Sequence, residues 1–162
     1  MNGTLAELAK YLLSCRVRED FKPMSIPALL KQVYILDVER GPNAHGTKFR
    51  IKLTGTGLDS IFGRAVSGRY LDEFIHGPRG AEVLAAYQQC AQDRAPCWMR
   101  QLVNIGNSPT RYVEGIMVYL DPQLIYGGLV AGKLSISSDS HFEKLPLHEA
   151  LRLADLPDRG DL

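Results

Sequence analysis

The stretch LTGTGLDSIFGRAVSGRYLDEF (residues 53–74) sets two close glycines between an expected strand and an expected helix. A dinucleotide-binding loop with such glycines has a third glycine or alanine three residues after the second, and its long helix leads to a parallel strand. Ser60 occupies that position after Gly57, and no Gly-Lys-Ser/Thr phosphate loop occurs in the chain. The stretch is therefore not a nucleotide-binding loop. Turns and helix ends, where a positive φ costs glycine little, are the expected places of Gly55, Gly57, Gly63 and Gly68.

The composition is that of an ordinary globular domain. The 162 residues are 45% hydrophobic and 23% charged, with a formal net charge of +1. A chain of this length forms one domain with a sizeable core. Its small net charge gives no general attraction to nucleic acid or to an anionic membrane. The chain has no apolar run of about 18 residues and no basic leader, so we expect no nucleic-acid or membrane partner and a cytoplasmic location.

Cysteines and histidines give no metal-binding pattern. The 3 cysteines, Cys15, Cys90 and Cys97, include no CxxC pair, and the 4 histidines are scattered singly. Neither a disulfide framework nor a zinc site is expected from this spacing.

Hydrophobic spacing predicts an N-terminal amphipathic helix, two strands, a helical insert and three further strands. Thr4 and Glu7 form a capping box at the start of the first helix. The expected helices lie at residues 4–18, 57–63, 68–75 and 77–93, and the expected strands at 32–39, 47–55, 96–105, 110–120 and 127–136. Residues 106–109 and 121–127 are interpreted as turns.

The strand at 47–55 has the clearest alternation in the chain. Phe49, Ile51 and Leu53 point to one side, and the basic residues between them point to the other. This pattern is typical of a half-buried strand in an antiparallel sheet. The basic row is interpreted as a solvated face rather than a nucleic-acid stripe.

The element order and three motifs resemble a PAS domain. The motifs are SIPALLKQVYILDV, FRIKLTGTGLDSIFGRAVSGRYLDEF and VEGIMVYL followed by GGLVAGKL. Residues 16–137 are most similar to a small stand-alone bacterial PAS-like family, found mainly in alphaproteobacteria. The resemblance implies an α+β fold with a five-stranded antiparallel sheet and short helices packed on one face. The expected parts are an N-terminal helix at 1–18, the PAS-like domain at 19–137 and a C-terminal tail with a short helix at 138–162.

PAS domains hold a small ligand or chromophore between sheet and helices, or dock other proteins, and usually pass a signal to an output domain. The rest of this chain is too short for a kinase, cyclase or DNA-binding unit. The resemblance therefore implies a sensory or regulatory module that binds a ligand, docks a signalling partner protein, or does both.

Two cofactors of PAS relatives lack matching residues here. Covalent flavin requires an Asn-Cys-Arg tripeptide in the helical insert, where this chain has only Cys90, late in the long helix. Haem requires a histidine on that helix, whereas His76 precedes Pro78 and is expected in the turn. Neither covalent flavin nor haem is expected, and the identity of any cofactor stays open.

Apolar side chains from sheet and helices are expected to line a ligand cleft. They are Phe49, Ile51 and Leu53 from the second strand, Phe62, Phe74 and Leu84 from the helices, and Trp98, Ile116 and Val118 from later strands. Alternatively, a domain of this size uses the same side chains as plain core. Arg64 and Arg69 are candidates for contact with an anionic ligand group, or for surface ion pairs with Asp59, Asp72 or Glu73.

The resemblance also implies a homodimer, because helices that precede PAS cores often pair across a dimer. Leu5, Leu8 and Leu12 are the candidate interface residues. Packing of the same leucines onto their own sheet is the alternative.

A second function class is a small pocket enzyme of isomerase or hydratase type, which needs a buried acid or base against an apolar wall. Glu114 is the candidate for this role and for a polar contact in the pocket, because it lies in an apolar strand and shares a face with Tyr112, Ile116 and Val118. A Glu exposed at a strand edge is the alternative and the preferred interpretation. No partner residue follows from spacing and no nucleophile motif is present. No catalytic residue is assigned, and the sensory module is the preferred interpretation.

Overall fold

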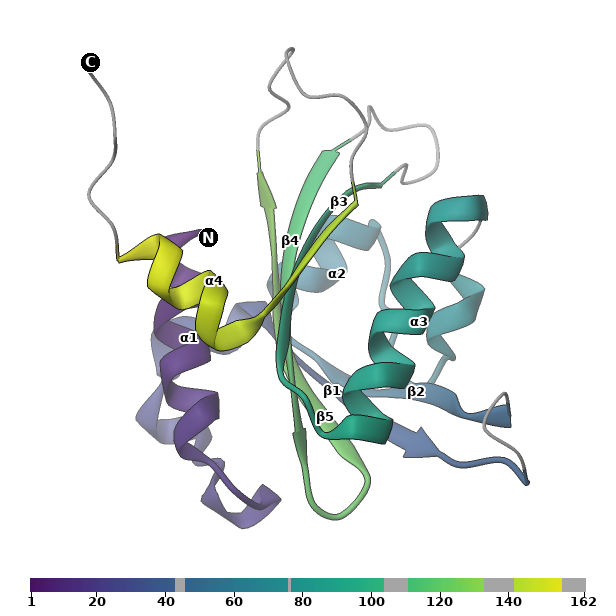
Figure 1. The fold of residues 1–162 in the computed structure, drawn as a ribbon, viewed down its shortest axis with the longest axis horizontal. Coiled ribbons are helices and arrows are strands. Elements are labelled where there is room, and N and C mark those ends of the chain that lie inside the picture. The colour runs from purple at the N-terminus through teal and green to yellow at the C-terminus, as the bar shows by residue number, and fades with distance from the viewer. Residues whose placement is uncertain (43–45, 76, 104–110, 133–141, 156–162) are drawn as a thin grey trace.

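The computed structural model describes residues 1–42, 46–75, 77–103, 111–132 and 142–155 (Figure 1). Its helices are α1 (Gly3–Ser14), α2 (Thr56–Phe62), α3 (Gly77–Asp93) and α4 (Leu147–Ala154), with short 3₁₀ helices η1 (Arg18–Asp20), η2 (Pro23–Ser25), η3 (Pro27–Gln32) and η5 (Leu71–Glu73). Its strands are β1 (Val33–Glu39), β2 (Lys48–Thr54), β3 (Cys97–Val103), β4 (Arg111–Leu120), β5 (Leu124–Gly132) and β6 (Glu143–Pro146). Within these ranges, no helix has the length and apolar character that crossing a bilayer requires.

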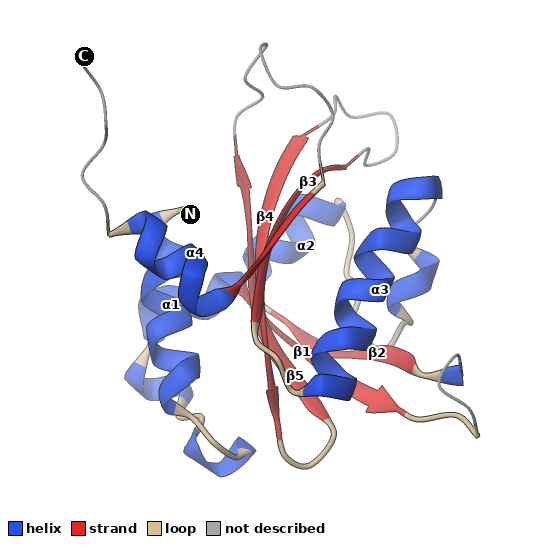
Figure 2. Cartoon of the chain, viewed as in Figure 1, coloured by secondary structure: helices blue, strands red, loops and turns tan. Residues whose placement is uncertain are grey.

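The strands form one antiparallel sheet in the order β2-β1-β5-β4-β3-β6. Helices α2 and α3 cover one face, here called the inner face, and α1 and α4 cover the opposite, outer face (Figures 1 and 2). The expected α+β class and antiparallel sheet are confirmed. The sheet has a sixth strand beyond the expected five, because residues 143–146 of the expected tail pair with β3. Strand β5 begins at Leu124, so part of the expected turn at 121–127 is strand.

The inner cluster is the set of buried side chains between the sheet and helices α2 and α3. Phe49 and Ile51 of β2 point into it, as the alternation predicts. The ring of Phe49 lies 5.7 Å from that of Tyr87 on α3, measured between centroids. These contacts join the edge of the sheet to the longest helix.

Leu53 does not share the inward side of β2, and its predicted place in the cleft is wrong. Ile35 pairs with Leu53 while Leu36 pairs with Ile51, so β2 carries Lys52 as one extra residue at a β-bulge. A bulge of one residue reverses the side to which the following residue points. Leu53 is accordingly 48% exposed.

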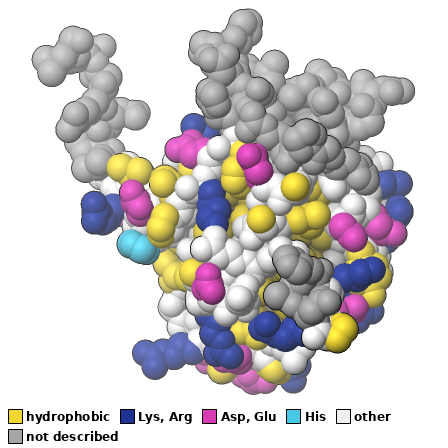
Figure 3. All heavy atoms as spheres, turned by 45° about the vertical axis from the view of Figure 1, so that its right-hand side comes forward, with side chains coloured by type: hydrophobic (Ala, Val, Ile, Leu, Met, Phe, Trp, Pro, Cys, Tyr) yellow, Lys and Arg dark blue, Asp and Glu magenta, His cyan; other side chains and the backbone are white. Residues whose placement is uncertain are grey.

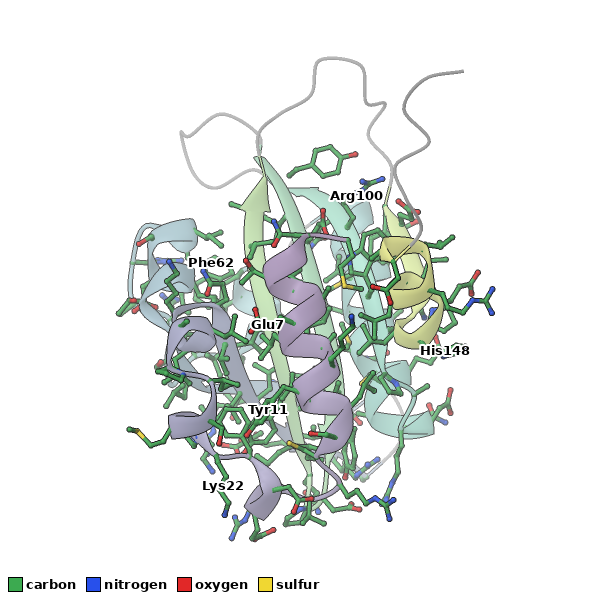
Figure 4. All side chains as sticks on the ribbon, turned by 90° about the vertical axis from the view of Figure 1, so that its left-hand side faces the viewer. Glu7, Tyr11, Lys22, Phe62, Arg100 and His148 are labelled. Carbon is green, nitrogen blue, oxygen red and sulfur yellow. The ribbon has the colours of Figure 1, made fainter. Side chains whose placement is uncertain are left out.

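The outer cluster is the set of buried side chains between the sheet and helices α1 and α4. Leu5, Leu8 and Leu12 of α1 belong to it, and each is 0% exposed. Figure 4 looks onto α1, which lies over the outer face of the sheet. The predicted use of these leucines as a dimer interface is wrong, because their own chain encloses them. A homodimer through other surfaces stays a prediction.

The start of α1 also differs from expectation. The helix begins at Gly3, and the side chain of Asn2 accepts a hydrogen bond from the N–H of Thr4 at 2.9 Å. Asn2 rather than Thr4 is therefore the capping residue.

Two consecutive glycines of β5 allow close packing on both faces of the sheet. A Cβ on Gly127 would lie 2.3 Å from both Ile116 O and Tyr34 Cζ. A Cβ on Gly128 would lie 2.5 Å from Leu8 Cδ2. The ring of Tyr34 therefore lies directly over β5 on the inner face, and α1 sits directly on β5 on the outer face.

The glycines of residues 53–74 have two different roles. Gly63 and Gly68 have φ angles of +69° and +86°, which confirms the expected left-handed positions. Gly55 instead has a φ of −71°, and its Cβ would lie 2.2 Å from Leu30 O. A Cβ on Gly57 would lie 2.7 Å from Lys31 O. Close approach of α2 to η3, and not a positive φ, requires glycine at 55 and 57.

We expect Gly127→Ala to lower the free energy of unfolding by about 3 kcal/mol, because the added methyl meets a backbone carbonyl that cannot move away. Gly128→Ala should lower it by only about 1 kcal/mol, since the flexible end of Leu8 can shift. Urea unfolding followed by fluorescence of Trp98 measures both. The matched control is Gly3→Ala, where a Cβ meets nothing within 4 Å. Equal effects of the variants at 127 and 128 would contradict this packing.

A second comparison tests the seat of α1. Leu8→Ala should lower the free energy of unfolding by about 3 kcal/mol, the usual effect of emptying a buried leucine site. Leu13→Ala, on the same helix but 40% exposed, should change it by less than about 1 kcal/mol. Urea unfolding and native mass spectrometry are measured together. A Leu8→Ala protein of normal stability but altered oligomeric state would restore the dimer interpretation.

Candidate functional site

Apolar side chains from α2, α3 and the segment around η5 continue the inner cluster towards the surface. These partly buried residues, here called the helical-side patch, are Ile61, Phe62, Phe74, Ile75 and Leu84. The rings of Phe62 and Phe74 lie 5.7 Å apart between centroids. Figure 3 brings the α3 side of the molecule forward and shows apolar side chains at the surface between charged ones. The patch is thus supported by the core and reachable from solvent.

Local backbone contacts hold the patch in place. Helix α2 ends at Phe62 with Gly63 as its left-handed C-cap, and Gly68 also has a positive φ. The N–H of Gly68 donates to Ile51 O at 2.6 Å, and the N–H of Ile51 donates to Arg69 O at 2.8 Å. These bonds attach the segment before η5 to the edge of β2. Phe74, which follows η5, therefore lies next to Phe62.

Two guanidinium groups lie against one ring of the patch. The Cζ atoms of Arg64 and Arg69 are each 5.0 Å from the ring centroid of Phe74, within the range of cation–π attraction. Arg69 Nε also lies 3.2 Å from Glu73 Oε2. In the described part of the chain, Arg64 has no carboxylate partner. Both side chains are exposed, so the patch has a positively charged rim.

The structure divides the predicted cleft residues between the two faces of the sheet. The inner side holds Phe49, Ile51, Phe62, Phe74 and Leu84. Trp98, Ile116 and Val118 belong to the outer cluster, so their predicted place in the cleft is wrong. Strand β4 is apolar on both faces, with Val113 and Met117 pointing inward. Sequence alternation therefore did not decide which set faces α2 and α3.

Glu114 lies on the outer side and anchors the start of α1. Its Oε2 accepts a hydrogen bond from the N–H of Asn2 at 2.8 Å and from Nε1 of Trp98 at 3.3 Å. The first turn of α1 has no acidic residue, so Glu114 supplies the negative charge that favours a helix N-terminus. Glu114 shares its face with Ile116 and Val118, as the alternation predicts, but that face is the outer one, so Glu114 does not meet the helical-side patch.

A pair of buried tyrosines connects α3 to the middle of the sheet. The hydroxyl of Tyr87 donates to that of Tyr34 at 3.0 Å, and the hydroxyl of Tyr34 donates to Ile116 O at 2.9 Å. Burial raises the pKa of both phenols, so both stay neutral. The sequence gives no signal for this pairing, because the two residues are 53 positions apart.

The thiols of Cys90 and Cys97 are buried near the C-terminal end of α3. Burial raises the pKa of Cys90 to about 12 and that of Cys97 to about 11, while nearby Lys144 opposes both shifts. Lys144 donates a hydrogen bond to Oε1 of Gln89 on α3. These thiols are protonated at neutral pH and act as small apolar groups.

No cluster of His, Cys, Asp and Glu within the described ranges could hold a metal ion. His76, considered above as a haem ligand, lies outside the described residues.

No family model matches the chain, and no curated protein matches it. Among solved structures, it is similar to a light-oxygen-voltage domain studied with a flavin analogue, with a TM-score of 0.52 and 15% identity over 68% of this chain and 83% of that one. It is also similar to the PAS domain of Bordetella pertussis BvgS, with a TM-score of 0.48 and 19% identity over 81% of this chain and 89% of that one. The chain has a PAS-like fold. The first likeness confirms the predicted fold, and membership of the small bacterial family stays a prediction.

Because burial raises the pKa of Cys90 and Cys97, we expect the free energy of unfolding to fall at alkaline pH. As pH rises past the ordinary thiol pKa of 9.0, the unfolded chain loses these protons before the folded one does. The stability that the buried, protonated thiols contribute is complete below pH 9.0 and is lost as the pH rises towards their pKa values in the folded protein. We expect the two thiols together to lower the free energy of unfolding by about 2 kcal/mol between pH 8.5 and 10.

Urea unfolding at several pH values measures this loss. The double variant Cys90→Ala, Cys97→Ala should be less stable at pH 8 but should show a flatter decline. An equally steep decline in the variant would show that these thiols do not control it.

Proposed function

We propose that this protein is a sensory or regulatory module that binds a small ligand at the helical-side patch and transmits its presence to a partner protein. The observation that carries the proposal is the patch itself, where apolar side chains of three segments extend the inner cluster to the surface. Grouped apolar and aromatic side chains that the fold leaves only partly buried are candidate binding places.

The proposed ligand has an aromatic or flat apolar body and an anionic group. Phe62 and Phe74 offer ring faces and edges to the apolar part. Arg64 and Arg69 offer guanidinium groups to a carboxylate, sulfonate or phosphate. Arg69 would exchange its exposed contact with Glu73, which contributes little in water.

The outer face supports this choice of side. Helices α1 and α4 already cover the outer cluster, and Glu114 is engaged at the start of α1. The enzyme alternative assigned to Glu114 therefore loses the apolar inner wall on which it rested. The helical-side patch combines accessibility, aromatic rings and charge at one place.

Binding of 8-anilinonaphthalene-1-sulfonate, an aromatic anion, tests the site. We expect Phe74→Ala and the double variant Arg64→Met, Arg69→Met each to weaken binding about tenfold, since loss of one charged or aromatic contact is worth about 1.4 kcal/mol. Arg18→Met is the matched control, because that guanidinium pairs with Glu19 on a different segment. Fluorescence titration gives the dissociation constants.

Native mass spectrometry of the freshly purified protein accompanies the titration. A bound species that is lost on denaturation and is absent from Phe74→Ala would identify the natural ligand. Equal probe binding by all the variants, together with a bare-chain mass, would count against ligand sensing at this patch.

A further inference from the structure

The turn between β4 and β5 accepts hydrogen bonds from residues that follow the C-terminal ends of α3, on the inner face, and α1, on the outer face. Asp121, the first residue of this turn, accepts a hydrogen bond on Oδ2 from Nη1 of Arg94 at 2.8 Å. Its backbone oxygen accepts the N–H of Arg18 at 3.1 Å. Arg94 directly follows α3 on the inner side, and Arg18 follows α1 on the outer side. One residue therefore joins the ends of two helices that lie on opposite faces.

Further contacts fix the geometry of this turn. The guanidinium of Arg94 lies 5.2 Å from the ring centroid of Tyr119, and the Tyr119 hydroxyl accepts the N–H of Gln123 at 3.1 Å. The backbone oxygen of Gln123 accepts the N–H of Val38 at 2.8 Å. The turn is thus bonded to β1 as well as to both helix exits.

Backbone strain is concentrated at the same place. Arg94 and Gln123 have φ angles of +52° and +54°, and in the described ranges they are the only residues other than glycine with positive φ. Side chains disfavour this left-handed region, so it persists where surrounding contacts hold it. A change at one partner of the turn is therefore expected to disturb the others.

We propose that the Asp121 turn couples the two faces of the sheet, so that a displacement of α3 loosens the C-terminal part of α1. This inference rests on the proposed function, because a ligand at the helical-side patch would contact α3 through Leu84. The link runs from α3 through Arg94 to Asp121, and from the Asp121 backbone to the segment that begins at Val17. Helix α1 would then report ligand binding on the far side of the sheet.

Hydrogen exchange of α1 amides tests this coupling without any ligand. Leu84→Ala perturbs α3, with Leu84→Val as the milder variant should the first fail to fold. In the otherwise unchanged protein, exchange near the end of α1 should accelerate about two- to fivefold beyond any change in β5, which reports global unfolding. In the Arg94→Met background, this additional acceleration should disappear.

Lys10→Met is the matched control. It removes the 3.4 Å ion pair between α1 and Asp155, which is similarly exposed but leaves the turn intact. The acceleration caused by Leu84→Ala should persist in this background. An α1 that responds equally with and without Arg94, or that never responds beyond β5, would overturn the proposal.

The same variants separate this inference from the ligand site. Arg94→Met should bind 8-anilinonaphthalene-1-sulfonate as the unchanged protein does, because Arg94 does not belong to the helical-side patch. Loss of the coupling in Arg94→Met with normal probe binding would support the proposal, whereas normal probe binding by a protein that shows no coupling even with Arg94 present would overturn the coupling alone. Absence of probe binding with intact coupling would overturn the ligand site alone.

Discussion

Close packing against the central strand β5 is the constraint on which the rest of the structure depends. Gly127 leaves room for the ring of Tyr34 on the inner face, and Gly128 leaves room for Leu8 of α1 on the outer face. Because Gly127 has no side chain, the Tyr34 hydroxyl can donate a hydrogen bond to Ile116 O of β4. It also accepts a hydrogen bond from the hydroxyl of Tyr87 on α3. Glycine at positions 127 and 128 therefore allows the helical layers of both faces to pack closely on β5. For this reason α1 is part of the folded core and not an accessory segment.

This two-sided burial decides where the chain can interact. On the outer face, the leucines of α1 and the charge of Glu114 are used within the chain. On the inner face, the tyrosine pair lies buried in the middle of the core, and partly buried apolar side chains occur on α2, just after η5 and on α3. The partly buried ring of Phe74 lies there against two exposed guanidinium groups, that of Arg64 and that of Arg69, of which Arg69 also pairs with Glu73. The asymmetry between the two faces is what favours the helical side.

Sequence patterns predicted the layers better than they predicted which layer covers which residue. Alternation placed Phe49 and Ile51 correctly because β2 has one polar side. It failed one step later at Leu53, since nothing in the residues around Lys52 signals a bulge. It also failed at Ile116 and Val118, because a strand with apolar residues on both sides gives no preference. Helices α1 and α4 cover the outer face through contacts between residues far apart in the sequence. Local periodicity does not report such contacts.

The glycines of the opening stretch show the same limit from another side. Sequence reasoning correctly assigned Gly63 and Gly68 to left-handed positions. It gave Gly55 and Gly57 the same explanation, although the backbone oxygens of η3 are what excludes a side chain there. That close approach seats α2 on η3, and α2 carries Phe62 to the ring of Phe74. Small residues that admit a neighbouring backbone therefore build the candidate site just as they build the centre of the sheet, and only the folded neighbour reveals them.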